Sequence, residues 1–194
     1  MDKLSYALGL SLGNNLKNSG VYGLDFAKLT KGIRDVYEGI TPEMTAQDAQ
    51  AVINDYFQAL QEQAAKGAIE EGNTFLAQNA QRPEVTTLES GLQYEIITKG
   101  EGVIPVATDS VTVHYHGTLI NGTVFDSSVR RGEPATFGVT QVISGWVEAL
   151  QLMPVGSKWK LFIPSNLAYG AQGAGQHIGP HTTLIFEVEL LGIA

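Results

Sequence analysis

Apolar side chains in the first 80 residues recur at the spacing of amphipathic helices. Leucines fall every fourth residue between Leu4 and Leu16, which predicts a first helix. A second is expected to begin after Asp25, since an Asp carboxylate is a good N-cap, and to end at Gly39. These early segments therefore predict helices with one apolar face each.

A third and longer helix is expected over residues 45–79. Thr45 is followed three residues later by Asp48, a variant of the capping box that marks a helix start. Helical spacing then continues for roughly thirty residues, or about 45 Å, until the breakers at 81–84. Few bulky core residues accompany these helices, so pairing with a second copy would bury their apolar faces. A homodimer is favoured, with ordinary packing within one chain as the alternative.

After Pro83 the apolar pattern changes to alternation along the chain. Apolar and polar residues alternate over 111–116 and 184–190, and residues 158–163 form a further strand candidate. A short helix is expected over 146–153. The fold class is therefore α+β: helices first, then an antiparallel sheet around one short helix.

One turn and the domain limits follow from the same pattern. The pair Asn121-Gly122 between two strand candidates is typical of a type I′ hairpin. We expect a helical dimerisation domain over 1–80, a linker over 81–88 and a second domain over 89–194.

Composition and charge exclude several classes of protein. The 194 residues are 43% hydrophobic and 16% charged, which is typical of a globular chain. The net charge is −8, and residues 1–88 carry 7 basic against 11 acidic groups, so the charge is shared between the halves. Because no basic stripe is present, we expect no nucleic-acid partner.

The chain has no cysteine, so disulfides, thiol catalysis and Cys-ligated zinc are excluded. No apolar run approaches the ~20 residues that span a bilayer, and the N-terminus lacks the pattern of a signal peptide. We expect a cytoplasmic protein, or a periplasmic or exported one if a signal peptide has been removed.

Candidate chemistry gathers in three segments that are rich in aromatic and branched residues, 124–128, 142–146 and 167–170. Only one carboxylate accompanies them, with no nucleophile beside a base. Such a pocket suits a reaction that needs no bond cleavage. Rotation about the peptide bond before proline is one, because its barrier is torsional.

The motifs in this half resemble those of FKBP-type peptidyl-prolyl cis-trans isomerases. The matching segments are Val113–Gly117, Gly122–Ser128, Val142–Trp146, Ala168–Gly170 and Pro180–Leu184. The resemblance covers about 89–194. The helices ahead of it are similar to the dimerisation module of the bacterial Mip-like branch of this family. The resemblance implies an FKBP-like fold and a folding catalyst that accelerates rotation of Xaa-Pro bonds.

The resemblance also implies a role for each pocket residue. Tyr115, Asp126 and Tyr169 match the catalytic positions, with Arg131 as the partner of Asp126. Substrate-binding positions match Phe125, Phe137, Val142, Ile143, Trp146, Ile178 and Phe186. The backbone N–H of Ile143 and the hydroxyl of Tyr169 are expected to bind ligand carbonyls. Asp126 is expected to orient other groups and not to act as an acid or base.

The same resemblance implies partners, and one alternative function stays open. Expected partners are unfolded or proline-containing clients, a second copy of the chain, and inhibitors of the FK506 and rapamycin type. No cofactor and no metal are expected; His114 and His116 share a strand face, but no third ligand accompanies them. The alternative function is a proline-binding holdase or adaptor with little catalytic role.

Overall fold

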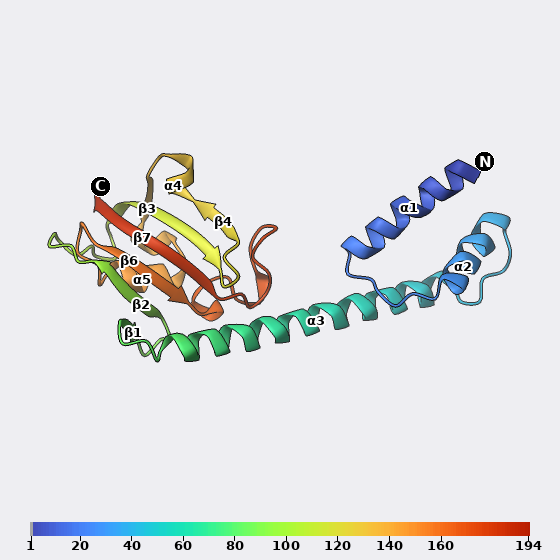
Figure 1. Ribbon diagram of the computed structural model, residues 1–194, viewed down its shortest axis with the longest axis horizontal. Helices are drawn as coiled ribbons and strands as arrows, with labels where there is room; N and C mark the ends of the chain where they lie inside the picture. The colour runs from blue at the N-terminus through green and yellow to red at the C-terminus, as the bar shows by residue number, and fades with distance from the viewer. Residues whose placement is uncertain (1) are drawn as a thin grey trace. The chain divides into compact units, whose positions relative to one another are not determined.

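The chain divides into two compact units, and the division falls inside one long helix. The computed structural model describes residues 2–194. One unit ends at Glu62 and the other runs from Gln63 to Ala194. Figure 1 shows the helices of the first unit and the sheet of the second. Each unit is described by itself below.

The first unit is helical, as the apolar spacing predicts. Its helices are α1 (Asp2–Asn18), α2 (Phe26–Glu38) and the first part of α3 (Ala46–Asn79). The Asp25 carboxylate accepts hydrogen bonds from the backbone N–H groups of Ala27 and Lys28, which caps α2. Gly39 ends α2 with φ 68°, a left-handed conformation that glycine adopts without strain. The predicted start and end of this helix are confirmed.

The long helix α3 begins at the predicted capping residue. The backbone N–H of Asp48 donates to Thr45 Oγ1 at 3.1 Å, and the Thr45 hydroxyl donates to the Asp48 carboxylate at 2.7 Å. The helix continues through Gly67 and Gly72 to Asn79. None of the helices in residues 2–194 combines the length and apolarity that a membrane span needs.

Apolar side chains of the first unit remain exposed. Helix α1 has no buried residue, and the side chains of Val36 and Tyr37 are 76% and 90% exposed. An apolar groove of about 680 Å³ runs between α2 and the start of α3. Its apolar lining includes Leu29, Ile33, Val36, Met44, Val52 and Ile53. This unit forms helices without enclosing a core of its own.

The second unit is built on a seven-stranded antiparallel sheet. Its strands are β1 (Val85–Thr87), β2 (Gln93–Thr98), β3 (Ser110–Leu119), β4 (Val124–Ser127), β5 (Ala135–Gly138), β6 (Lys158–Ile163) and β7 (Leu184–Ile193). The strand order is β1-β2-β6-β7-β3-β4, and β5 pairs with β3. Short helical turns connect them: α4 (Ser128–Arg131), η1 (Val139–Gln141), α5 (Ser144–Leu150), η2 (Ser165–Leu167) and η3 (Gly170–Gln172).

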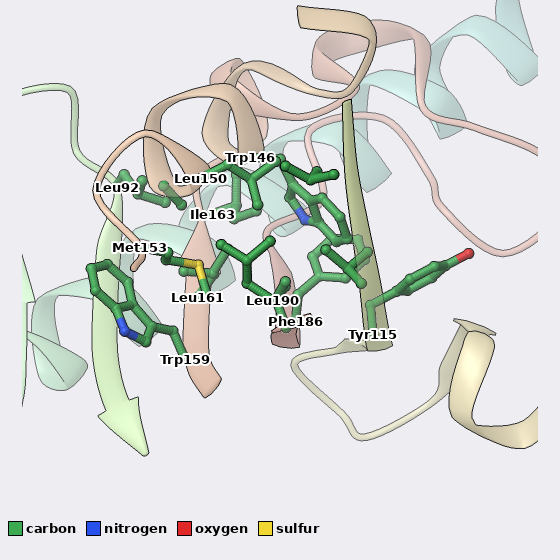
Figure 2. Packing of buried hydrophobic residues seen from close by; sticks show 14 of the residues in the cluster. Leu92, Tyr115, Trp146, Leu150, Met153, Trp159, Leu161, Ile163, Phe186 and Leu190 are labelled. Carbon is green, nitrogen blue, oxygen red and sulfur yellow. The ribbon is translucent and has the colours of Figure 1, made fainter. Parts of the chain in front are cut away.

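The core of this unit lies between the sheet and α5. Leu161, Leu184 and Leu190 are almost fully buried in this cluster, and Figure 2 labels Leu161 and Leu190. Trp146 from α5 and Trp159 from β6 each remain 4% exposed. The α+β fold predicted from the sequence, an antiparallel sheet wrapped around one short helix, is therefore the fold of the chain.

The final turns of α3 pack on this sheet. The Gln93 side chain donates from Nε2 to the carbonyl of Leu76 at 2.9 Å and accepts from Asn79 Nδ2 at 2.8 Å. The rings of Phe75 and Phe162 lie 5.9 Å apart. Residues 63–79 thus belong to the second unit by their packing.

Two local predictions need correction. The 121–122 turn is not type I′, because that type needs positive φ at both central residues and only Gly122 has it, at 84°. The connection instead spans three residues, with the backbone N–H of Leu119 donating to the carbonyl of Thr123. The short helix begins at Ser144, two residues before the expected start, and ends at Leu150.

Candidate active site

One aromatic cavity of about 620 Å³ opens in the second unit. All ten residues that the resemblance assigns to the site line it. The full lining is Tyr115, Phe125, Asp126, Phe137, Gln141, Val142, Ile143, Trp146, Tyr169, Ala174, Gly175, Gln176, His177, Ile178 and Phe186. Four strands and loops far apart in the sequence therefore meet at one site.

Aromatic rings around Trp146 form the base of the cavity. Phe186, Tyr115 and Phe137 approach the Trp146 ring nearly edge-on, at centroid distances of 5.3, 5.5 and 6.0 Å. Edge-to-face packing at these distances is a favoured aromatic geometry. Figure 2 shows Trp146, Phe186 and Tyr115 together at one side of the buried cluster. The indole Nε1 of Trp146 is buried without a hydrogen-bond partner within residues 2–194.

Gly117 on strand β3 lets the rings of Phe125 and Phe186 pack close together. A Cβ atom on Gly117 would lie 2.7 Å from the Phe125 ring and 2.8 Å from the Phe186 ring. Because real Cβ contacts are longer, any larger residue here would separate the two rings. The 5.3 Å edge-on pair of Phe125 and Phe186 depends on this glycine.

Asp126 is the one carboxylate in the cavity wall, and two side chains and one backbone N–H hold it. The hydroxyl of Tyr115 donates to Asp126 Oδ2 at 2.5 Å, and Arg131 forms an ion pair with the other oxygen. Arg131 also donates from Nη2 to the Tyr115 hydroxyl at 2.8 Å. The backbone N–H of Ser127 donates to Asp126 Oδ1 at 2.8 Å. The three side chains form a closed triangle of hydrogen bonds.

This triangle fixes the protonation of its members. Partial burial by itself would raise the pKa of Asp126, but the hydrogen bonds from Tyr115 and Arg131 outweigh it and lower the pKa below its ordinary value. Burial, followed by the hydrogen bond to Asp126, raises the pKa of the Tyr115 hydroxyl. At neutral pH the carboxylate is ionised and the phenol is protonated, so neither group is poised to exchange a proton.

Two hydrogen-bond donors at the cavity are unoccupied. The backbone N–H of Ile143 makes no hydrogen bond within the described chain, although its carbonyl accepts from Trp146 and Val147 at the start of α5. The hydroxyl of Tyr169 likewise has no partner among residues 2–194, and this side chain is 40% exposed. Both can donate hydrogen bonds to the carbonyl oxygens of a bound peptide.

The sequence did not identify every lining residue. Gln141 and the segment 175–177 reach the cavity through the η1 turn and the loop before β7. Loop residues of this kind carry no periodic signal. The two strand histidines each lie beside a serine: His114 Nδ1 is 3.1 Å from Ser128 Oγ, and His116 Nδ1 is 2.9 Å from Ser127 Oγ. The described residues contain no group of three potential metal ligands.

Known families match both parts of the chain. The family model described as FKBP-type peptidyl-prolyl cis-trans isomerase matches residues 102–191. A second family model, described as the domain amino terminal to FKBP-type peptidyl-prolyl isomerase, matches residues 1–96. The FKBP-type 22 kDa peptidyl-prolyl cis-trans isomerase of Escherichia coli is 51% identical over 97% of this chain and 93% of its own length. The chain belongs to the FKBP-type peptidyl-prolyl cis-trans isomerase family.

Further relatives agree with this FKBP-type assignment over nearly the whole chain. The "Outer membrane protein MIP" of Legionella longbeachae is 45% identical, over 99% of this chain and 85% of its own length. The crystal structure of FkpA from Escherichia coli matches with a TM-score of 0.82 and 36% identity, covering 98% of this chain and 95% of that one. The protein is therefore a peptidyl-prolyl cis-trans isomerase. The cytoplasmic location expected from the sequence finds no support among these names.

Proposed function

We propose that isomerisation takes place in the aromatic cavity, with the proline ring of the client seated on Trp146. Phe125, Phe137 and Phe186 supply the apolar walls around it, with Val142 and Ile178 on the aliphatic side. The observation that carries this assignment is the convergence of all ten expected site residues on one 620 Å³ cavity.

The chemistry of the bond fits a cavity of this kind. In the twisted transition state the amide loses resonance, so its carbonyl is less polar than in the planar ground state. A dry apolar site disfavours the polar ground state more than the twisted state, which is differential binding. A thousandfold acceleration needs only about 4 kcal/mol of such preference.

We assign orienting roles to the polar groups. The Ile143 N–H and the Tyr169 hydroxyl would hold the client carbonyls on either side of the rotating bond. Asp126, Tyr115 and Arg131 would fix the wall against which the amide twists. No step requires a proton to move, because rotation neither forms nor breaks a covalent bond.

The two buried tryptophans offer a matched test. Trp146 lines the cavity and Trp159 does not, yet each is 4% exposed with an unpartnered indole N–H among the described residues. In a proline-peptide assay, Trp146→Leu is expected to lower kcat/KM about tenfold, or about 1.4 kcal/mol. Trp159→Leu is expected to stay within about twofold. Equal losses in the two variants would contradict the assignment.

We also propose that the helical unit joins two copies of the chain into a homodimer. The exposed apolar groove beside α2 supports this, since a second copy would cover it. Functionally we divide the chain into a dimerisation module (1–80), a connection (81–88) and an isomerase domain (89–194). Two isomerase sites in one assembly would engage one unfolded client at raised effective concentration.

A second candidate function is a holdase that binds unfolded clients without using catalysis. The exposed apolar surface of the helical unit favours it. Suppression of client aggregation that survives Trp146→Leu would assign holding to the helices, whereas loss with that variant would assign it to the cavity.

Similarity to the relatives supports two further proposals, on inhibitor binding and on location. The FKBP family binds macrolides, and we propose that the aromatic cavity of this chain takes FK506- and rapamycin-type ligands. A Trp159→Phe variant would report this through the fluorescence of Trp146 alone. We favour a periplasmic or exported protein, since one relative is named an outer membrane protein.

A further inference from the structure

A second, smaller cavity of about 200 Å³ lies next to the aromatic one. The two share His177, which lines both. The smaller cavity is bounded by α3, by the β3–β4 turn and by the loop before β7. Its polar lining includes Glu71, Asn121 and Thr182. The two cavities are therefore neighbours in the second unit.

The helix that carries Glu71 is held against the isomerase sheet. Gly72, the next residue, is buried and faces Thr183, and a Cβ atom at this position would collide with the Thr183 hydroxyl. One turn further on, the carbonyl of Leu76 accepts the hydrogen bond from Gln93. The carboxylate is therefore presented from a fixed element and not from a mobile loop.

Glu71 is free to meet a cation. It is exposed and forms no ion pair within residues 2–194. The chain as a whole carries a net charge of −8, which favours cationic ligands.

The rest of the lining suits the stem of a long basic side chain. Ala68, Leu119 and Ile120 provide apolar surface beside the carboxylate. Lysine and arginine lay their methylene stems on such surface while the charged head meets a carboxylate. The cavity is thus matched to an amphipathic cation better than to an anion or a purely apolar group.

We infer that this cavity is a client subsite for a lysine or arginine side chain near the isomerised proline. The inference rests on the proposed placement of proline in the aromatic cavity, because His177 links the two. The isomerase then prefers clients with a basic residue at one position flanking the Xaa-Pro pair. The preference acts through binding, so it appears in KM more than in kcat.

The test uses the full-length protein and peptides with Lys, Ala or Glu at each position within three residues of the proline. At one position the wild type is expected to show kcat/KM about threefold to fivefold higher for Lys than for Glu, the size of a partly exposed ion pair. Glu71→Gln is expected to remove this preference, and Glu71→Lys to reverse it. Glu70→Gln, an exposed neighbour outside the cavity, is expected to keep it.

Rates on the Ala peptides separate the subsite from the isomerase site. They are expected to be the same in the wild type and all three variants. A Lys preference that is absent in the wild type, or equal in Glu71→Gln and Glu70→Gln, overturns the subsite while the Ala rates still support the aromatic cavity. If Ala rates do not fall with Trp146→Leu, the placement of proline fails, and the subsite with it.

Discussion

The two units of this chain place their apolar residues in opposite ways. In the second unit Val111, Leu184 and Val188 are strand residues with fully buried side chains. In the first unit no hydrophobic side chain is buried, and the one buried residue among residues 2–62 is Asp35. A unit with a complete core can fold and act alone, whereas helices with exposed apolar faces gain most of their stability from packing against something else.

The largest difference is expected when the core is truncated. Leu184→Ala is expected to lower the free energy of unfolding of the second unit by about 3 kcal/mol, the usual cost of a Leu→Ala cavity. Leu8→Ala, on the exposed face of α1, should leave this transition unchanged. Denaturant unfolding followed by tryptophan fluorescence measures both, because both tryptophans lie in the second unit. A loss below about 1 kcal/mol for Leu184→Ala would contradict the assigned core.

A charge in the apolar groove is expected to separate the copies. Val36→Glu should raise the dimer dissociation constant at least tenfold, or about 1.4 kcal/mol, because a two-fold interface receives the charge twice. Gln47→Glu adds the same charge on α3 outside the groove and serves as control. Light scattering over a dilution series gives both constants. Equal constants for the two variants would remove the groove from the interface.

The smallest effect is expected from the charge of Asp126. Because its pKa is lowered, this carboxylate stays ionised above its ordinary value of about 3.9, and any stabilisation it gives is lost only as the pH falls through its lower folded value. Tyr115, whose pKa is raised, stays protonated to above about 10. The pH profile of kcat/KM should therefore be flat between about pH 5 and pH 9.

A variant separates orientation from proton transfer at this position. Asp126→Asn keeps the shape and removes the charge, so we expect a loss of tenfold or less (below about 1.4 kcal/mol) that is the same throughout this pH range. Glu133→Gln, an exposed carboxyl group outside the cavity, is the control. A sloping or bell-shaped profile in the wild type that disappears in Asp126→Asn would make Asp126 an acid or base.

Local signals in the sequence predicted local structure well. The caps at Asp25 and Thr45 and the alternation in β7 depend on neighbouring residues, and the structure has each of them. The prediction of a type I′ turn at Asn121-Gly122 was wrong because a dipeptide does not fix the length of the connection that contains it. The long-range contacts, such as the one between Gly72 and Thr183, carry no local pattern.

The site was predictable only where motifs recur in a known family. Trp146 or Phe186 alone has the pattern of an ordinary core residue, and only the resemblance set them together. Gln141 and His177 could not be found in this way, because the paths of η1 and of the loop before β7 depend on tertiary packing. The same holds for Glu71, which lines the smaller cavity from α3.

The division of work between the two units can be measured in one pair of assays on full-length protein. Val36→Glu should leave kcat/KM on a proline peptide within about twofold of wild type, because the aromatic cavity lies wholly in the second unit. The same variant should accelerate the proline-limited refolding of a protein client several-fold less than the wild type does. A fall in the peptide rate, or refolding at the wild-type rate, would contradict this division.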